Sequence, residues 1–444
     1  MFRPRLISST VAQQAGAPGV GEHLCPGVLH AVQAKDGLLI RIRVPGGFIE
    51  ANQLRTVANL SRDFADRTIE ITSRANLQLR AIRNRDLPYI IEGISLAGLL
   101  PSPQHDRVRN ILTSPIAGLD GEEIVDPRPL IHDLDLRLRK ESVFANLHPK
   151  FSFAIHGGGR WFSRENDDVS LEAVGLNPAP YFRLSIGGAY SGFVVKPGDA
   201  VDCMLAAARM CIGLANESSL PVRGKAVATI PGAMKGIVES LSHLLTPSPV
   251  THPSRLVDEA PLGIYSTTQP GRVSIIPSVH LGRLSAEQAI DLAAAANEWE
   301  GDLRLAPWRG VVLGSIPKSA VDKIVGRLDS MGLSCDGRDG FRGIAACAGS
   351  HGCEASLADV RNDAATLAHR LSDHAVPPGW TVNLSGCEKK CAQRHGATAE
   401  LIAGPLGYTL NIAGHRVASD CSPEFALNAV ADLHENLLSE VAAR

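Results

Sequence analysis

The sequence lacks an excess of charge of either sign. Its 44 Lys and Arg residues nearly balance its 46 Asp and Glu residues, so the formal net charge is −2. Proteins that bind nucleic acid usually carry a basic excess or basic runs, and polybasic tails are typical of proteins that bind membrane surfaces. Neither feature is present here. We therefore expect no nucleic-acid partner and no membrane partner.

Long hydrophobic runs are also missing. The most apolar stretch, YIIEGISLAGLL, is short and contains Glu92, whereas a transmembrane helix needs about 20 apolar residues. The N-terminal stretch MFRPRLISSTVAQQAGAPGVG contains two arginines but no apolar segment of the kind that a secretory signal requires. These absences predict a soluble, cytoplasmic protein.

Two common cofactor and cross-link patterns are absent as well. Nine cysteines are an odd number for a disulfide framework, and a chain with no secretory signal favours metal-binding or catalytic thiols instead. No Gly-x-Gly-x-x-Gly segment opens a strand–helix–strand unit, because the glycine-rich IHGGGRWF has the wrong spacing. The sequence therefore shows no dinucleotide-binding fingerprint of its own.

Four cysteines do form a pattern. AACAGSHGCEAS contains Cys347 and Cys353, and NLSGCEKKCAQRHG contains Cys387 and Cys391. The apolar spacing after Cys353 predicts an amphipathic helix, which would place this thiol at a helix N-terminus that stabilises a thiolate. TVNLSG alternates like a strand, so Cys387 should lie just past a strand end. We expect the two pairs to converge on one metal centre.

The chemistry of that centre is left open by the residues alone. Structural zinc sites usually separate paired ligands by two to four residues. Five residues separate Cys347 from Cys353, so the spacing favours an iron–sulfur cluster over zinc. Four unrelated buried thiols are the third possibility. Of the other cysteines, Cys203 and Cys211 lie in an apolar helical segment and should be core residues, while Cys25 is expected to be structural.

A repeat runs through the chain. GFIEANQLRTVANLS begins at Gly47 and GRLSAEQAIDLAAAA at Gly282, and both are helical by pattern. Each follows an alternating strand and precedes a strand-like run, IEITSRANLQLRAI or LRLAPWRGVVLGSI. A strand–helix–strand unit thus occurs twice. We expect the two copies to pack into one pseudo-symmetric sheet that is complete in a monomer.

Each repeated unit is followed by a longer stretch of mixed α/β pattern. The first stretch ends at the proline-rich LLTPSPVTHPS, which reads as a linker. The second ends in a helix expected to begin with Ser422 as N-cap and Pro423 at its first position. The predicted segments are an N-terminal segment 1–35, a half-domain 36–100, an α/β domain 101–250, a second half-domain 262–335, and a cysteine-bearing α/β domain 336–444.

A duplicated half-domain followed by Cys-x5-Cys and Cys-x3-Cys resembles the sirohaem sulfite and nitrite reductase superfamily. The resemblance implies an α+β fold with duplicated ferredoxin-like half-domains and two further α/β domains, related by a pseudo-two-fold axis. It also implies a [4Fe–4S] cluster held by Cys347, Cys353, Cys387 and Cys391. In that superfamily the last of these ligands, here Cys391, also bridges to the sirohaem iron.

Other segments match the superfamily too. TSRANLQLR places Arg74 and Gln78, DRVRNI places Arg109, and NLHPKFSF places Lys150 in a Lys-x-Lys segment whose second lysine is Ser152 here. The loss of that lysine weakens the cationic field that sulfite reduction needs. Cations beside an anionic cluster and a polycarboxylate ring would lower the cost of bringing them together. The predicted tetrapyrrole contacts are Arg74, Gln78, Arg80, Arg109, Lys150, Lys389 and Lys390.

Within the superfamily, CPGVLHAVQAKDGLLIRIRVPGG, SGCEKKCAQ and GCEASLADVRND are similar to the precorrin-3B synthase family. The resemblance implies a monooxygenase of aerobic cobalamin biosynthesis. It would use O2 and NADH to hydroxylate precorrin-3A at C20, with formation of a γ-lactone. It also implies a mononuclear non-haem iron, for which no histidine is assigned. Without a dinucleotide fingerprint, we expect the electrons of NADH to arrive through a separate reductase.

Two other functions remain open at this point. One is a sirohaem-dependent sulfite or nitrite reductase, in which sirohaem would be a resident cofactor. The other is a zinc-stabilised or tetrapyrrole-carrying protein without enzymatic activity.

Overall fold

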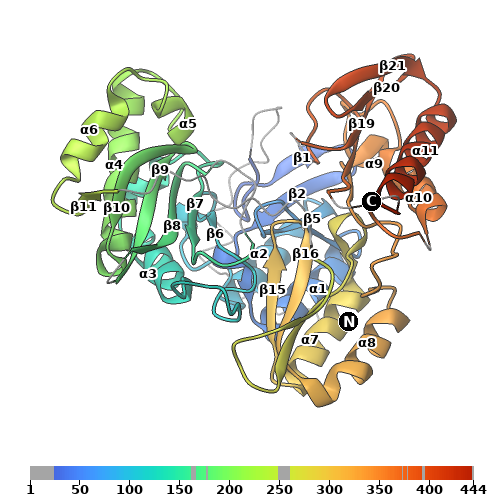
Figure 1. Ribbon diagram of the computed structural model, residues 1–444, viewed down its shortest axis with the longest axis horizontal. Helices are drawn as coiled ribbons and strands as arrows, with labels where there is room; N and C mark the ends of the chain where they lie inside the picture. The colour runs from blue at the N-terminus through green and yellow to red at the C-terminus, as the bar shows by residue number, and fades with distance from the viewer. Residues whose placement is uncertain are drawn as a thin grey trace.

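The computed structural model describes residues 25–161, 167–176, 179–248, 261–372, 374–377, 379–392 and 396–442. Most of the expected N-terminal segment, and residues 249–254 of the expected linker, lie outside this range. The described chain forms three lobes (Figure 1). The two half-domains together form the lobe at the centre and bottom, and one α/β unit lies on either side of it. The fold is mixed α+β, as predicted. No described helix is long and apolar enough to cross a membrane.

The first half-domain is built on an antiparallel sheet, sheet A. Alternation in LLIRI buries Ile40 and Ile42 on one face, while the arginines between and after them point to the other. The apolar face is covered by α1 (Ala51–Phe64) and α2 (Leu87–Leu96). In order across the sheet, the strands are β1 (Val32–Ala34), β2 (Gly37–Ile42), β5 (Leu77–Ile82), β4 (Thr68–Ile71) and β14 (Arg283–Ser285).

The second half-domain repeats this arrangement in sheet B, covered by α7 (Ala286–Glu298) and α8 (Val321–Ser330). Its strand order is β12 (Gly263–Ser266), β13 (Arg272–Ile276), β16 (Gly310–Pro317), β15 (Asp302–Ala306) and β3 (Phe48–Ile49).

The two halves exchange their short edge strands. β14 of the second half pairs with β4 of the first, and β3 of the first half pairs with β15 of the second. The expectation of a single pseudo-symmetric sheet is therefore wrong, because the halves form two sheets joined by these exchanged strands. Each strand-like run after a repeated helix is also a hairpin rather than one strand: β4–β5 in the first half, β15–β16 in the second.

The repeat holds at the level of single contacts. Both α1 and α7 begin with a capping box, formed by Glu50 with Gln53 and by Ser285 with Gln288. Gln53 Nε2 then donates to the carbonyl of Ala97 at 3.1 Å, and Gln288 Nε2 donates to that of Met331 at 2.8 Å. The glutamine in each copy thus caps its own helix and ties it to the end of the next helix.

Two glycines mark where the halves cross. Gly47 has φ +74° and Gly282 has φ +71°, a backbone region that favours glycine. A Cβ at Gly47 would lie 2.3 Å from the carbonyl oxygen of Leu305, and one at Gly282 would lie 3.2 Å from that of Ile71. Leu305 and Ile71 are equivalent in the repeat. Each glycine therefore lets its turn pass close to the opposite half.

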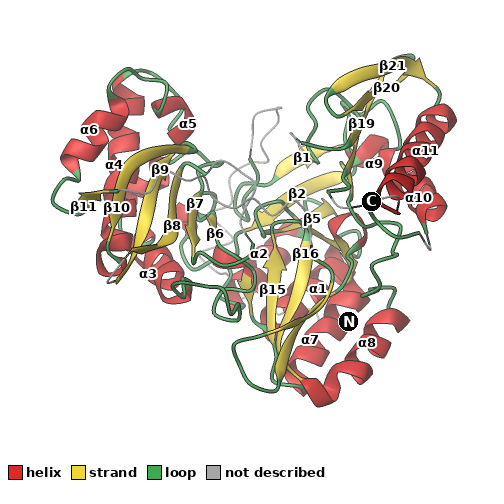
Figure 2. Ribbon diagram, viewed as in Figure 1, coloured by secondary structure: helices red, strands yellow, loops and turns green. Residues whose placement is uncertain are grey.

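The first α/β unit is built on sheet C, shown at the left of Figure 2. Its first three strands are parallel neighbours and the rest are antiparallel. The strands are β6 (Ile111–Leu112), β7 (Phe153–His156), β8 (Val169–Leu176), β9 (Ala179–Ile186), β10 (Ala189–Val195) and β11 (Leu245–Pro247). The helices are α3 (Arg128–Leu138), α4 (Ala200–Glu217), α5 (Gly224–Val227) and α6 (Ala233–Ser240). β11 shows that the expected linker begins with a strand.

The cysteine unit, residues 344–442, repeats the topology of the first α/β unit. β17, β18 and β19 are parallel neighbours, and β20 and β21 continue the sheet antiparallel. Its elements are β17 (Ile344–Ala346), β18 (Val382–Ser385), β19 (Ala399–Gly404), β20 (Gly407–Ile412), β21 (His415–Cys421), α9 (Gly349–Gly352), α10 (Val360–Leu371) and α11 (Pro423–Ala442). α10 follows β17 as α3 follows β6, so the duplication extends to this unit.

Two local predictions in these units are confirmed. Ser422 Oγ accepts the backbone N–H of Phe425 at 3.2 Å, which caps α11. Cys203 and Cys211 lie fully buried on α4, where burial raises the pKa of each thiol to about 12.

Candidate functional site

The four cysteines lie on two loops at one edge of the sheet formed by β17 to β21. Cys347 directly follows β17, and Cys387 comes two residues after β18, as predicted. Because β17 and β18 are parallel neighbours, the loops at their carboxyl ends meet. The backbone N–H of Gly386 donates to Cys347 Sγ at 3.3 Å, and its carbonyl accepts the N–H of Leu357 at 2.8 Å. One loop is thus hydrogen-bonded to the other.

The position predicted for Cys353 at the start of a helix is wrong. Cys353 ends the short helix α9, with its N–H bonded to the carbonyl of Gly349. The next helix, α10, begins only at Val360, where the side chain of Asp359 accepts the N–H of Asn362 and acts as the cap. Leu357 fits the helical spacing but is exposed. Any stabilisation of the Cys353 thiolate must therefore come from the loop and from nearby cations.

The donor chemistry of these loops fits an iron–sulfur cluster. Four thiols lie on two contacting loops, three half-buried and Cys391 exposed. Gly386 leaves no room for a side chain, because a Cβ there would lie 1.8 Å from Ser356 Oγ. Among the described residues, no three His, Cys, Asp or Glu side chains are gathered closely enough to hold a metal ion. The structure thus places the four thiols on adjacent loops, and their assignment as cluster ligands stays a prediction.

Cations from both half-domains hold these loops. Lys35 Nζ donates to the carbonyl of Ser350 at 2.7 Å, and Arg80 donates to that of Gly352. From the second half, Arg309 donates to the carbonyls of Cys391 and Ala392. Both cysteine loops therefore carry positive charge against their backbone. Cations in this position favour thiolates and an anionic cluster.

The lysine pair between Cys387 and Cys391 is arranged differently. Lys390 Nζ pairs with Glu400 Oε2 on β19 at 2.8 Å, and its backbone has φ +45°. Lys389 is exposed. Their assignment as tetrapyrrole contacts stays a prediction, and the charge of Lys390 is shared with an internal carboxylate.

The outer face of sheet A is polar and looks toward the cysteine unit. Arg41, Gln78, Glu70 and Arg283 are register partners on β2, β5, β4 and β14, so they form one row across the sheet. Arg41 Nη2 donates to Gln78 Oε1 at 2.9 Å, and Gln78 Nε2 donates to Glu70 Oε2 at 2.6 Å. The Gln78 amide, which is buried, thus links a half-buried cation to a half-buried carboxylate.

Glu70 connects this row to the cysteine unit. Arg361 on α10 donates to Glu70 Oε1 at 2.5 Å, and Arg283 lies 3.6 Å from the same oxygen. Burial opposes ionisation of Glu70, but the charges of Arg361, Arg80 and Arg283 prevail and lower its pKa. The carboxylate is therefore ionised near neutral pH and anchors α10 to sheet A.

Two asparagines connect the three sequence segments that were predicted to contact the tetrapyrrole, those of Arg74, Arg109 and Lys150. Asn76 Nδ2 donates to Asn110 Oδ1 at 3.2 Å, and Asn110 Nδ2 donates to the carbonyl of Pro149 at 3.1 Å. These contacts bring the loop of Arg74 and the loop of Lys150 together. Burial lowers the pKa of His148, and the charges of Arg223, Lys150 and Arg74 lower it further. The positive charges of Arg74, Lys150 and Arg223 thus lie near one another where these loops meet.

Arg80 and Arg109 are engaged within the protein. The Arg80 guanidinium binds both carboxylate oxygens of Asp36, at 2.9 and 3.0 Å. Arg109 does the same with Asp135 on α3, at 2.6 and 3.0 Å, and is only 6% exposed. Bidentate pairs of this kind fix an arginine firmly. Contact of Arg80 and Arg109 with a substrate stays a prediction. In the structure, each arginine forms an ion pair that joins two segments of the fold.

Ser152 is buried at the start of β7. It is 1% exposed, its backbone N–H donates to Asp168 Oδ2 at 2.8 Å, and its hydroxyl has no hydrogen-bond partner among the described residues. Asp168 also accepts from Arg223 Nε at 2.8 Å. The position expected to hold a second lysine therefore presents no charge of its own to the site.

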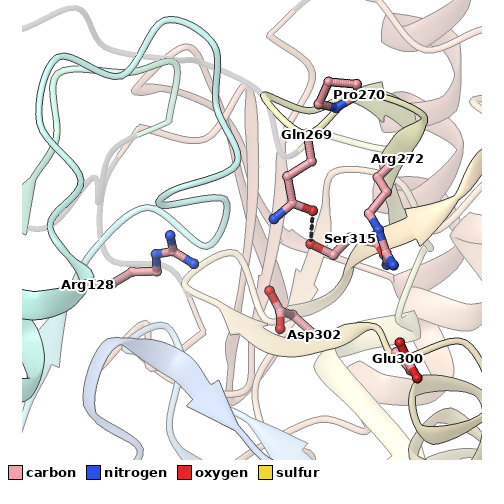
Figure 3. A pocket seen from close by; sticks show the side chains of 7 residues that line it. All are labelled: Arg128, Gln269, Pro270, Arg272, Glu300, Asp302 and Ser315. Carbon is pink, nitrogen blue, oxygen red and sulfur yellow. Dashed lines mark hydrogen bonds between the residues drawn. The ribbon is translucent and has the colours of Figure 1, made fainter.

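The duplication also repeats a surface hollow. One hollow, of about 530 Å³, opens at the edge of sheet B beside α3 (Figure 3). The other, of about 540 Å³, lies at the equivalent edge of sheet A beside α10 and is lined in part by His351 and Gly352. Glu300 and Asp66 are equivalent residues in the two linings, as are Ser315 and Ala81. Neither hollow is lined by a residue predicted to contact the tetrapyrrole.

Fold and site together define the class of protein. Two ferredoxin-like half-domains join two α/β units of similar topology. One of these units carries four thiols on loops whose backbone carbonyls bind cationic side chains. Family comparison agrees. The nitrite/sulfite reductase ferredoxin-like half domain matches residues 30–97 and 266–331, and the nitrite and sulphite reductase 4Fe-4S domain matches residues 104–201. These ranges span more than half of the chain, which belongs to the nitrite and sulfite reductase superfamily, a group of oxidoreductases.

The match to the 4Fe-4S domain lies on the α/β unit without the cysteine pairs. No cysteine occurs within residues 104–201. The cysteine unit has the same order of parallel and antiparallel strands, so it is the structural twin of the matched domain. The family finding supports an iron–sulfur cluster in the protein. Its assignment to the unit that contains the thiols stays a prediction.

The similar proteins include both nitrite or sulfite reductases and a precorrin-3B synthase. A ferredoxin–nitrite reductase of Synechococcus elongatus is 27% identical over 87% of this chain and 80% of its own. A precorrin-3B synthase of Sinorhizobium sp. is 28% identical over 88% of this chain and 82% of its own. Sulfite reductase [ferredoxin] 2 of Mycolicibacterium paratuberculosis is 29% identical over 80% and 68%. Identities this similar do not separate the activities.

A solved structure supports the fold. The Mycobacterium tuberculosis NirA protein superposes with a TM-score of 0.73 at 23% identity, covering 89% of this chain and 79% of that chain.

Several residues of the site were not predicted from the sequence. They are Arg41 and Arg43, which bind Gln78 and the carbonyls of Pro26 and Arg107, and Glu70, Arg309 and Arg361, which join the half-domains to the cysteine unit. A signal existed for the first two, because strand alternation in LLIRIRV places both arginines on the face opposite the isoleucines. No local pattern pointed to Arg309 or Arg361, since their roles depend on how the units pack.

Proposed function

We propose that the protein is a precorrin-3B synthase, an iron–sulfur monooxygenase that converts precorrin-3A to precorrin-3B. The reaction consumes O2, two electrons and two protons, hydroxylates C20, forms a γ-lactone and releases water. The resemblance of three sequence segments to that family, and a relative of that name matched over most of both chains, support the proposal.

In this proposal Cys347, Cys353, Cys387 and Cys391 hold a [4Fe–4S] cluster, which supplies electrons one at a time when bound. The N–H of Gly386 already donates to Cys347 Sγ, and such bonds tune the potential of a cluster. Arg309 and Arg80 hold the loops from outside. The proposal includes a mononuclear non-haem iron, although His351 is exposed and paired with Asp359, and His395 lies outside the described residues.

The ring of the substrate would lie against the polar face of sheet A, near Arg74 and Lys150. A precorrin carries many carboxylates, so a cationic wall both binds and orients it. Electrons would come from NADH through a separate reductase. Tight binding of NADH to the isolated protein would contradict that route. We also propose that the protein acts as a monomer in the cytoplasm.

The observation that carries the choice of activity is Ser152. A sulfite reductase needs several cations that converge on a small dianion, and this position contributes a buried, uncharged hydroxyl. A large substrate with many carboxylates depends less on one lysine, because its charge is distributed over several contacts.

The second candidate is a sirohaem-dependent nitrite or sulfite reductase. The nitrite reductase relative, similar to this chain over a like share of its length, favours it. Sirohaem would then be a resident cofactor, and Arg74 and Lys150 would face its carboxylates and a small anion.

Turnover distinguishes the two. Anaerobically purified protein with intact cluster is given precorrin-3A, O2, NADH and a ferredoxin reductase system, and the product is analysed by mass spectrometry. We expect a product heavier by one oxygen atom that carries label from ¹⁸O2. Reduction of nitrite or sulfite by the same preparation, without conversion of precorrin-3A, would contradict the proposal.

A further inference from the structure

Arg223 lies beside the position at which the expected second lysine is missing. That position is Ser152, whose backbone N–H donates to Asp168 Oδ2 at 2.8 Å. The other oxygen of the same carboxylate, Oδ1, accepts from Arg223 Nε at 2.8 Å. Because Ser152 and Arg223 bind one carboxylate, the guanidinium lies next to the start of β7. It comes from a distant part of the chain, the residue before α5.

The fold holds Arg223 firmly in this place. Asp168 is 1% exposed, and its Oδ1 also accepts the N–H of Gly224 at 2.6 Å. A Cβ at Gly224 would lie 2.1 Å from the carbonyl oxygen of Asp168, so α5 begins in close contact with the residue that precedes β8. Arg223 is thus fixed through its side chain and through the backbone of its neighbour. A donor fixed in advance loses less conformational entropy when it binds a ligand.

One edge of this guanidinium has no internal partner. Asp168 takes the N–H of Nε, and among the described residues neither Nη1 nor Nη2 of Arg223 has a hydrogen-bond partner. The side chain is 23% exposed, and neither Nη atom is sealed from solvent. The Nη1–Nη2 edge is therefore accessible. With such an edge an arginine can bind a carboxylate through two parallel hydrogen bonds.

The accessible edge belongs to the cationic group around the loop of Lys150. After burial, the charge of Arg223 does most to lower the pKa of His148, followed by that of Lys150, and Arg74 also contributes. His148 Nδ1 accepts the backbone N–H of Lys150 at 3.1 Å, so the imidazole is part of the same loop. Arg223 therefore lies close to two of the predicted tetrapyrrole contacts, although no sequence segment pointed to it.

We propose that Arg223 is a further substrate-binding residue, which holds one carboxylate of the tetrapyrrole with Nη1 and Nη2 while Asp168 positions it. This inference rests on the proposed function and deepens it. A lysine at position 152 would add net positive charge, whereas the Arg223–Asp168 pair adds hydrogen-bond donors with no net charge. Such a pair suits a carboxylate on a large ring. It does little for a small dianion, which depends on the net field of the site.

The test compares Arg223→Gln and Arg223→Lys with Arg137→Gln as matched control. Arg137 is 32% exposed and pairs with Asp202 in the same α/β unit, where it joins α3 to α4. The affinity for uroporphyrin, a ring rich in carboxylates, is measured by fluorescence quenching. Thermal midpoints are measured without ligand and with nitrite or sulfite. Arg223→Lys is included because Arg223→Gln leaves the buried Asp168 carboxylate uncompensated and can prevent folding.

We expect Arg223→Gln to bind uroporphyrin about 10- to 100-fold more weakly, the range for loss of a charged hydrogen bond. Arg223→Lys keeps the charge beside Asp168, and hence the midpoint, but loses the planar edge, so its affinity should fall about 10-fold. Arg137→Gln should bind as the wild type does. Arg223→Gln should also raise the pKa of His148 in an NMR titration, because a charge that lowers it is gone.

The outcomes separate this inference from the proposed function. Unchanged uroporphyrin affinity in Arg223→Lys would overturn the role of Arg223, even if Arg223→Gln does not fold, while ring binding by the wild type would leave the proposed function intact. If the wild type is stabilised by nitrite or sulfite but does not bind uroporphyrin, the proposed function and the carboxylate contact both fail. Arg223 would then act on a small anion only if Arg223→Lys changes that stabilisation.

Discussion

Arg109 shows how a residue assigned by resemblance takes on a structural role in the fold. Its position in DRVRNI suggests a substrate contact, but its guanidinium is buried and bound at both ends of the Asp135 carboxylate. A sequence does not reveal such a partner, because Asp135 lies on α3 and approaches only when α3 packs beside the loop. For Arg41 and Arg43 the strand alternation was readable from the sequence, whereas their hydrogen bonds to Gln78 and to the carbonyls of Pro26 and Arg107 required the structure.

Replacing Arg109 by alanine should therefore cost stability. Removing one partner of a buried ion pair leaves the other charge uncompensated, at about 3–5 kcal/mol. Arg139 also contacts Asp135, at 3.1 Å, so we expect the lower end of that range in urea unfolding. An unchanged free energy of unfolding together with weakened substrate binding would instead make Arg109 a substrate contact.

Cys391→Ser should remove the cluster and the activity together. A thiolate is the ligand that iron–sulfur clusters need, and a serine hydroxyl rarely replaces it. Iron and acid-labile sulfide per protein are measured, with Cys335→Ser as control, because burial raises the pKa of the Cys335 thiol to about 12 and keeps it protonated. Full turnover in a Cys391→Ser protein without cluster would refute the role of the cluster.

His156 on β7 should make stability depend on pH. Burial lowers the pKa of its imidazole from 6.5 to about 4 in the folded protein. Between these values the unfolded chain binds more protons, so the contribution to stability is complete above pH 6.5. It is lost as the pH falls toward 4, by about 3 kcal/mol in all. Urea unfolding at several pH values should show this loss in the wild type and a smaller one in His156→Gln.

At the scale of elements, the sequence predicts most helices and the repeat but not how strands are shared. Apolar periodicity locates α1, α7 and α11, and Gly47 and Gly282 mark equivalent turns. The exchanged strands β3 and β14 are only two and three residues long, too short to leave a pattern. The start of α10 was misjudged because Leu357 continues the apolar spacing, whereas Asp359 decides where the helix begins.

The turns where the halves cross should tolerate no side chain. In Gly47→Ala, the new Cβ would lie 2.3 Å from the carbonyl oxygen of Leu305, and the positive φ adds about 1 kcal/mol. We expect a loss of more than about 2 kcal/mol in urea unfolding. Gly414→Ala is the matched control, since Gly414 has φ +80° with nothing within 4 Å of a Cβ. Equal losses in the two variants would show that close approach of the halves is unimportant.

At the scale of the whole molecule, the two half-domains form one cohesive body. A single hydrophobic core contains residues of both, such as Leu54 on α1 and Leu292 on α7, while each α/β unit has a core of its own. The halves should therefore unfold together. We expect the most protected amides of α1 and α7 to exchange with the same free energy in native-state hydrogen exchange. Clearly different values would mean that the halves open independently.

The central claim is that the tetrapyrrole is the substrate of this protein and the iron–sulfur cluster its resident cofactor. The most direct measurement is the visible absorption spectrum of protein purified without oxygen, together with analysis of iron and inorganic sulfide. A broad iron–sulfur shoulder, with iron and sulfide present and no tetrapyrrole bands, is the predicted result. Sharp sirohaem bands would contradict the claim and make the ring a cofactor for nitrite or sulfite reduction.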